Sequence, residues 1–400
     1  MRYQNLFLFL IGFIITFFFF LYNSLYNNSN TLLFINLGIV IYYLYLDEFN
    51  RVNKWSKWEK VFLLILLVGS TILIFWVNNI FWIILLLEIQ SFIILGNSAI
   101  FYSSRSHKYL NATEAAFVYL IPSFTSLICF LGAALSQIVN FTCSINSYYL
   151  IIIALCIKLG ATPFHFWIPQ VINNLDYKAI ILLSGLNKIP IIYLTQLINP
   201  SGIFLLILGT FSITIGSCLM LNTIKIKELI AYSGIINSGW IILVITIQWP
   251  SLLYLFFVIY LTSLILLTII SREKIFLKEL KSPSYIFKKQ NYYNVILYMS
   301  LISLGGLPPL LAFILKYLII LNILTFTNTF LFIFYLIFLS VVSIFIYLRP
   351  VTSNKNKILW EKIKQLTKKS ENYYKETLSV NIALSMPLLT IIGSYILITK

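Results

Sequence analysis

Charged residues are scarce in this chain. Asp, Glu, Lys and Arg make up 10% of its 400 residues, whereas 60% are hydrophobic, and the mean hydropathy is +0.93. Soluble domains carry about 25% charged residues, so this composition excludes an ordinary soluble protein. Only helices and closed barrels satisfy the backbone inside lipid. Long apolar runs therefore predict an all-α integral membrane protein.

Residues that hold metals or redox groups are also few. The two histidines, His107 and His165, lack the helical spacing of a paired-histidine haem site, and no glycine-rich phosphate loop is present. The four cysteines have no C-x-x-C spacing, so neither a disulfide framework nor an iron–sulfur site is supported; they are Cys129, Cys143, Cys156 and Cys218. We therefore predict no metal and no cofactor in this chain, with any redox reaction occurring elsewhere.

Long apolar runs divide the chain into about thirteen candidate transmembrane helices of roughly 20 residues each. They span about 4–22, 31–46, 60–78, 79–101, 112–138, 147–175, 177–197, 202–222, 228–247, 251–271, 293–323, 327–348 and 380–399. Two of them are too long to be simple helices, and each contains helix-breaking residues. The breakers are Pro163 in the sixth span, and Gly305, Gly306, Pro308 and Pro309 in the eleventh.

Lysine and arginine fall on one side of this predicted topology. With alternating spans, every Lys and Arg except Lys158, Lys188, Lys316 and Lys400 lies in the N-terminal tail or in every second loop. The positive-inside rule produces this asymmetry, which predicts an inward N-terminus and an outward C-terminus. Orientation then explains the net charge of +16, and a nucleic-acid partner is not needed.

The spans group into two sets of five. The broken span is the fourth member of both sets, and an odd number of spans inverts the second copy, as in many secondary transporters. The inner-side loop Thr352–Ser379 contains ILWEKIKQL, which fits either an amphipathic surface helix or a solvated basic linker. The predicted regions are N-terminal helices (1–59), a first repeat (60–200), a second repeat (201–350), the basic loop (351–379) and a C-terminal helix (380–400).

Four charged side chains lie well inside predicted spans: Glu88, Lys158, Lys188 and Lys316. Intramembrane charges are expensive and usually functional. Burial favours the neutral form of a lysine and a nearby carboxylate favours the charged form, whereas arginine does not titrate. A Glu88–Lys158 pair followed by Lys188 and Lys316 would therefore suit a proton relay. The alternative is a static ion pair with snorkelling lysines.

Three further residues are candidates for the relay or for its hydration. His165 follows the first break, and its imidazole either extends the chain of titratable groups or bonds freed backbone there. Tyr232 and Asn237, in IAYSGIINSGW, add polar positions to the ninth span. Pro163, Gly305, Gly306, Pro308 and Pro309 are expected to shape the helix breaks.

Four motifs, in order, resemble the chain 2 family of NADH:ubiquinone oxidoreductase, the antiporter-like membrane-arm subunits of respiratory complex I. They are LLLEIQSF, KLGATPFHFWIPQV, KELIAYSGIINSGW and SLGGLPPLLAFILKY, and with the lysine of LNKIP they cover about residues 80 to 320. The resemblance implies two inverted five-helix bundles with broken helices and one proton pathway.

By this resemblance, Glu88 and Lys158 correspond to the family's paired glutamate and lysine, Lys188 to its central lysine and Lys316 to the lysine near the exit. Relatives often carry histidine near Asn237. Most full-length members have fourteen helices, so thirteen fits the loss of one N-terminal helix. Implied partners are other membrane-arm subunits, including antiporter-like paralogues, and lipids. The expected location is the mitochondrial inner membrane, with a bacterial plasma membrane as the alternative.

The predicted function is proton translocation coupled to NADH:ubiquinone electron transfer in other subunits. A free-standing cation/proton antiporter shares the architecture, but a sodium site calls for carboxylates near the breaks, and Glu88 alone is available. A non-conducting structural subunit is the third reading, and retention of all four buried charges disfavours it.

Overall fold

The computed structural model describes the chain from residue 62 to residue 352. Within that range it leaves out residues 64, 68, 72, 75, 78, 102–105, 141–144, 176, 199, 201, 224, 250–251, 254–255, 258, 266–299, 308–309 and 328–329. Predictions for the spans 4–22, 31–46 and 380–399, for nearly all of the loop 352–379, and for Pro308 and Pro309 lie outside the described residues.

Every regular element in the described part of the chain is a helix. In order they are α4 (Ile80–Phe101), α5 (Ser106–Asn140), α6 (Ile145–Leu159), α7 (Trp167–Asn174), α8 (Tyr177–Ile181), the π-helix η1 (Leu182–Leu186), α9 (Lys188–Ile198), α10 (Ile203–Leu221), α11 (Ile226–Ile247), α14 (Leu311–Thr327) and α15 (Phe330–Thr352). Further helical residues lie between 62 and 76, between 252 and 265, and at 300–305.

Three of these helices are long and apolar enough to cross a membrane by length and composition alone. They contain the stretches Thr113–Ser136, Ile203–Leu221 and Ile226–Ile247. Shorter apolar helices include Ile80–Gly96 and Ser147–Leu159. The observed helices therefore fit a membrane protein, while the count of thirteen spans stays a prediction.

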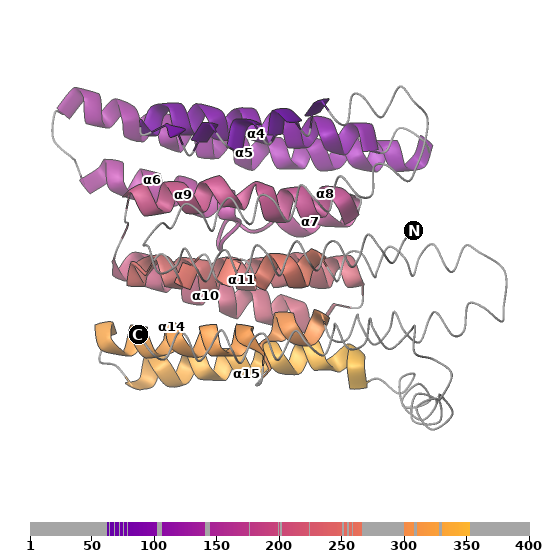
Figure 1. Ribbon diagram of the computed structural model, residues 1–400, viewed down its shortest axis with the longest axis vertical. Coiled ribbons are helices and arrows are strands. Elements are labelled where there is room, and N and C mark those ends of the chain that lie inside the picture. Colours follow the sequence, from indigo (N-terminus) through magenta and orange to yellow (C-terminus); the bar gives the residue numbers. More distant parts are fainter. Residues whose placement is uncertain are drawn as a thin grey trace. The chain divides into compact units, whose positions relative to one another are not determined.

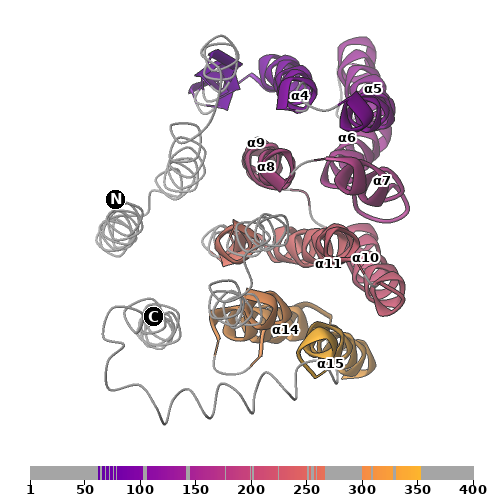
Figure 2. The same ribbon diagram turned by 90° about the vertical axis from the view of Figure 1, so that its right-hand side faces the viewer.

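The chain divides into two compact units. The first contains residues 1–215 and 227–255, and the second contains residues 216–226 and 256–400. In the first unit, α5 packs against α4, α6 and α7, and α4 and α6 both contact α9. Figure 1 shows α4 next to α5. Figure 2, which views the helices end-on, shows α8 and α9 beside α4. Helix α11 is buried along nearly its whole length.

Small residues bring α10 and α11 of the first unit close together. A Cβ added at Gly239 would meet the Gly209 carbonyl oxygen at 2.8 Å and would overlap the Ser212 side chain. Such small-residue contacts are a common way for helices to pack in membranes, where lipid supplies no hydrophobic driving force between them. In the second unit, α14 packs against α15.

Candidate functional site

The sequence KLGATP ends helix α6 in the middle of an apolar run. The Gly160 N–H donates to the Ile157 carbonyl at 3.1 Å, and the Ala161 N–H donates to the Cys156 carbonyl at 3.0 Å. These two bonds, with Gly160 at φ +71°, form a Schellman motif. The backbone then stays non-helical until α7 begins at Trp167. The chain therefore leaves the helix at Gly160, ahead of the predicted breaker Pro163.

Lys158 lies in the last turn of α6, so the break puts its ammonium at the carbonyl end of a helix. The partial negative charge there stabilises a cation. The lysine residue is only 9% exposed. The early helix end therefore gives this buried ammonium a first source of stabilisation, supplied by the backbone.

Gly160 is the residue at which the break is most sensitive to substitution. An L-residue in the left-handed region costs about 1–2 kcal/mol. A Cβ at Gly160 would also overlap the Ile168 side chain and approach the Trp167 ring to 3.3 Å. We expect Gly160→Ala to lower the thermal stability of the purified membrane complex that contains the chain and to reduce its recovery.

The matched control for this change is Gly132→Ala on α5. There an added Cβ meets Leu150 at 3.7 Å, an ordinary contact. Native gels and a thermal melt would compare the two variants. Equal recovery and equal melting temperature for both would show that the left-handed turn at Gly160 is dispensable.

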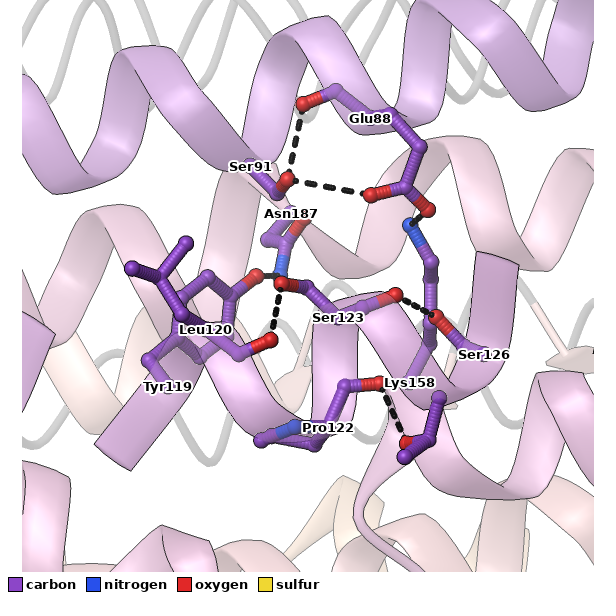
Figure 3. A network of polar contacts seen from close by, with 10 residues as sticks. Glu88, Ser91, Tyr119, Leu120, Pro122, Ser123, Ser126, Lys158 and Asn187 are labelled. Carbon is purple, nitrogen blue, oxygen red and sulfur yellow. Dashed lines mark hydrogen bonds and ion pairs between the residues drawn. The ribbon is translucent and has the colours of Figure 1, made fainter. Parts of the chain in front are cut away.

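Glu88 of α4 and Lys158 of α6 form a buried ion pair. Lys158 Nζ lies 2.6 Å from Glu88 Oε1, and the two side chains are 6% and 7% exposed, respectively. Ser91, one turn along α4, donates its hydroxyl to the Glu88 carbonyl at 2.7 Å and approaches Glu88 Oε2 at 3.4 Å. Figure 3 has the carboxylate between Ser91 and Lys158. The structure thus brings together the two residues predicted to pair.

Lys188 begins α9 directly after a π-helical turn. The Asn187 N–H donates to the Leu182 carbonyl at 3.2 Å, a bond five residues long that widens the helix. Such π turns are frequent at functional sites, and the sequence did not predict this one. The Lys188 ammonium is buried and lies 3.5 Å from the Gly234 carbonyl oxygen of α11. This contact is longer than a typical N–H···O bond, which is near 2.9 Å.

Helix α11 carries the two polar residues predicted for the ninth span. Asn237 is buried, and its amide donates to the Ser233 carbonyl of the same helix at 2.8 Å. Tyr232 is half-buried. The contact between Lys188 and Gly234 therefore places a predicted relay lysine against the same helix that carries Tyr232 and Asn237.

His165 lies in the non-helical segment between α6 and α7. It is buried, and its ring lies 4.3 Å from that of Phe166. The polar group beside its imidazole is the Pro163 backbone. Its Nδ1 atom is buried without a hydrogen-bond partner, so both predicted roles of His165 stay predictions.

The second unit contains the other broken span and Lys316. The helical turn at 300–305 ends at Gly306, which has φ +77°. Lys316 Nζ, from α14, donates to the Gly305 carbonyl at 2.9 Å. Lys316 is 4% exposed. A left-handed glycine, Gly160 or Gly306, thus follows the helix end at both predicted breaks.

Several polar residues escaped prediction from the sequence. Lys227, counted only as a loop charge, donates to the Asn173 and Leu175 carbonyls at 3.0 and 2.6 Å and so caps the end of α7. Tyr119, Ser123 and Ser126 are buried on one face of α5. Their spacing of four and three residues in an apolar helix was the available signal.

A metal or cofactor site would need converging ligands. Among the residues with assigned positions, no group of three His, Cys, Asp or Glu side chains gathers in this way. The predicted absence of a cofactor stays a prediction. The described residues instead form a group of buried titratable side chains near helix ends and hydroxyl groups.

Known proteins are similar to this chain in sequence and in fold. Residues 32–343 match the NADH:quinone oxidoreductase/Mrp antiporter transmembrane family. NADH-ubiquinone oxidoreductase chain 2 of Didelphis virginiana is 32% identical over 254 residues, which are 63% of this chain and 71% of the relative. The chain of the same name from Osphranter robustus is 30% identical over 312 residues, or 72% and 82% of the two chains.

Two solved structures share the fold at low sequence identity. A chain of the Mrp complex from Dietzia sp. DQ12-45-1b superposes with a TM-score of 0.64 at 16% identity, covering 81% of this chain and 65% of that one. A chain of respiratory complex I from Thermus thermophilus gives 0.53 at 18% identity, covering 85% and 88%. The chain therefore belongs to the NADH:quinone oxidoreductase/Mrp antiporter transmembrane family, in which it is similar to NADH-ubiquinone oxidoreductase chain 2.

Proposed function

We propose that this chain is a proton-translocating membrane-arm subunit of respiratory complex I. In this proposal, NADH:ubiquinone electron transfer takes place in other subunits, and this chain carries protons without a cofactor of its own. Family membership and the relatives named NADH-ubiquinone oxidoreductase chain 2 support the assignment. The same reasoning gives other membrane-arm subunits as its partners and the mitochondrial inner membrane as its location.

The observation that carries the proposal is the buried Glu88–Lys158 ion pair at the end of the broken helix. Removing an ion pair from water is expensive, and a pair of apolar residues would often be at least as stable. A buried acid–base pair beside irregular backbone is the arrangement expected of a site that exchanges protons.

In the proposed mechanism, energy from electron transfer separates Glu88 from Lys158. Loss of the carboxylate favours the neutral form of Lys158, which then releases its proton toward Lys188. From there the proton passes to Lys316 and leaves on the outer side. Lys188 is buried beside the Gly234 carbonyl of α11, which fits a titratable group inside the helix bundle.

The detailed architecture also belongs to the proposal. We infer about thirteen transmembrane helices, with residues 60–200 and 201–350 as inverted five-helix repeats, each with one broken helix. The extra helices at 1–59, the basic loop at 351–379 and the helix at 380–400 flank them. A helix that ends at a left-handed glycine in each of the two predicted broken spans, at Gly160 and at Gly306, supports the repeat.

Cation/proton exchange is the second candidate, favoured by the similarity to the Mrp complex chain. Cations such as Na⁺ need several oxygen ligands. Among the buried residues with described side chains, Glu88 is the single carboxylate, and Lys158 neutralises it. This charge balance favours proton movement over metal-cation transport.

The assignment can be tested by identifying the membrane complex that contains this chain. Native membranes would be gently solubilised and run on a native gel, and this chain would be located by mass spectrometry. We expect it in a large particle that oxidises NADH in the gel. Migration alone, or with antiporter-like chains and no NADH-oxidising activity, would reject the complex I assignment and favour the exchanger.

A further inference from the structure

A hydrogen bond connects the ion-pair region to the start of α9. The Asn187 side-chain amide donates to the Tyr119 hydroxyl oxygen at 2.7 Å, across 68 residues of sequence. Asn187 is 4% exposed and Tyr119 is 5% exposed. A short polar contact in such an apolar setting is strong, because no water competes for it.

Asn187 and Lys188 are consecutive but meet different helices. Asn187 reaches Tyr119 on α5, whereas Lys188 reaches Gly234 on α11. The π turn that ends at Asn187 determines the directions in which the Asn187 and Lys188 side chains extend. A shift of the Asn187 side chain would therefore move the backbone from which the Lys188 ammonium extends.

Tyr119 lies at the junction of four elements. Its ring packs edge-on against Trp167 of α7 at 5.3 Å, and its hydroxyl accepts from Asn187. Because the hydroxyl oxygen accepts from Asn187, the phenol proton is left to donate to a second acceptor. Figure 3 places Tyr119, Asn187, Ser91 and Glu88 in one cluster.

We propose that Tyr119 and Asn187 are positioning residues that transmit the state of the Glu88–Lys158 pair to Lys188. This inference rests on the proposed proton relay. While Lys158 neutralises Glu88, the pull of the carboxylate on the Tyr119 hydroxyl is weak. When the pair separates, the bare carboxylate attracts that hydroxyl, and the shift passes through Asn187 to Lys188. An asparagine amide does not titrate, so the signal passes through Asn187 as a displacement of its side chain and not as a proton transfer.

The test uses the assembled complex in proteoliposomes, with proton uptake during NADH oxidation measured at equal amounts of complex. Tyr119→Phe keeps the ring against Trp167 and removes the hydroxyl. Loss of one such hydrogen bond corresponds to about a five-fold change in an equilibrium, so we expect the proton uptake that this subunit contributes to fall about five-fold. The matched control is Tyr149→Phe, which removes a hydroxyl from a 44% exposed side chain and should leave uptake unchanged.

Two further comparisons separate positioning from packing. Proton uptake in Asn187→Ala should be as low as in Tyr119→Phe, and it should be no lower in the double variant. Asn187→Gln keeps an amide donor and should recover proton uptake. Effects of residues acting through one shared bond are not additive. Additive losses, or an Asn187→Gln variant no better than Asn187→Ala, would overturn the inference.

A parallel Lys188→Ala variant distinguishes this inference from the relay on which it rests. Normal proton uptake in Lys188→Ala would reject the relay itself. Loss of uptake in Lys188→Ala, with normal uptake in both Tyr119→Phe and Asn187→Ala, would reject the positioning role alone. If Tyr119→Phe does not assemble, the comparison of Asn187→Ala with Asn187→Gln still decides the question.

Discussion

Replacing Lys158 with methionine is expected to have the largest effect on stability of any single change in the site. Methionine keeps the length of the side chain, but Glu88 is left as a buried carboxylate without its partner. Removing one member of a buried pair destabilises a protein by about 3–5 kcal/mol. We therefore expect a strongly lowered melting temperature of the assembled complex and no proton uptake through this subunit.

The double variant Glu88→Gln/Lys158→Met separates structure from function. It removes both charges, so no unpaired ion remains and most of the lost stability should return. Proton uptake should stay absent, because the acid–base pair is gone. A double variant that is stable and pumps normally would mean that the pair is a static structural contact. A double variant as unstable as Lys158→Met would refute the charge argument.

Lys188→Ala is expected to have the largest effect on function with little effect on the fold. Alanine is the best helix former, and Lys188 is the first residue of α9. Helix α9 should therefore persist. In the relay, however, Lys158 and Lys188 are the only buried lysines among the described residues of the first unit. Proton passage should stop at this step.

The bounds of some helices could be predicted because the length of an apolar run limits where a helix lies. The predicted fourth span, 79–101, falls on α4 (Ile80–Phe101), and the predicted eighth, 202–222, falls on α10 (Ile203–Leu221). The break in the sixth span was expected from Pro163. The structure ends the helix three residues earlier, because a glycine in the left-handed region closes the Schellman motif before proline is reached.

The polar partners could not be predicted in the same way. The proximity of Glu88 and Lys158 depends on how α4 and α6 pack around α5, across 70 residues of sequence. Asn187 is visible beside Lys188 in LNKIP, but a π turn leaves no sequence periodicity, so its contact with Tyr119 was hidden. The sequence indicated only that Lys227 is an inner-loop charge. Its hydrogen bonds to the carbonyls at the end of α7 depend on where α7 lies in the fold.

The most direct test of the relay is the ratio of protons moved to NADH oxidised by the Lys188→Ala complex in sealed proteoliposomes. Lys225→Ala is the control, because Lys225 is an exposed lysine between α10 and α11. The relay predicts that the protons carried by this subunit are lost in Lys188→Ala, while assembly and the control ratio are unchanged. An unaltered ratio in the assembled Lys188→Ala complex would contradict it.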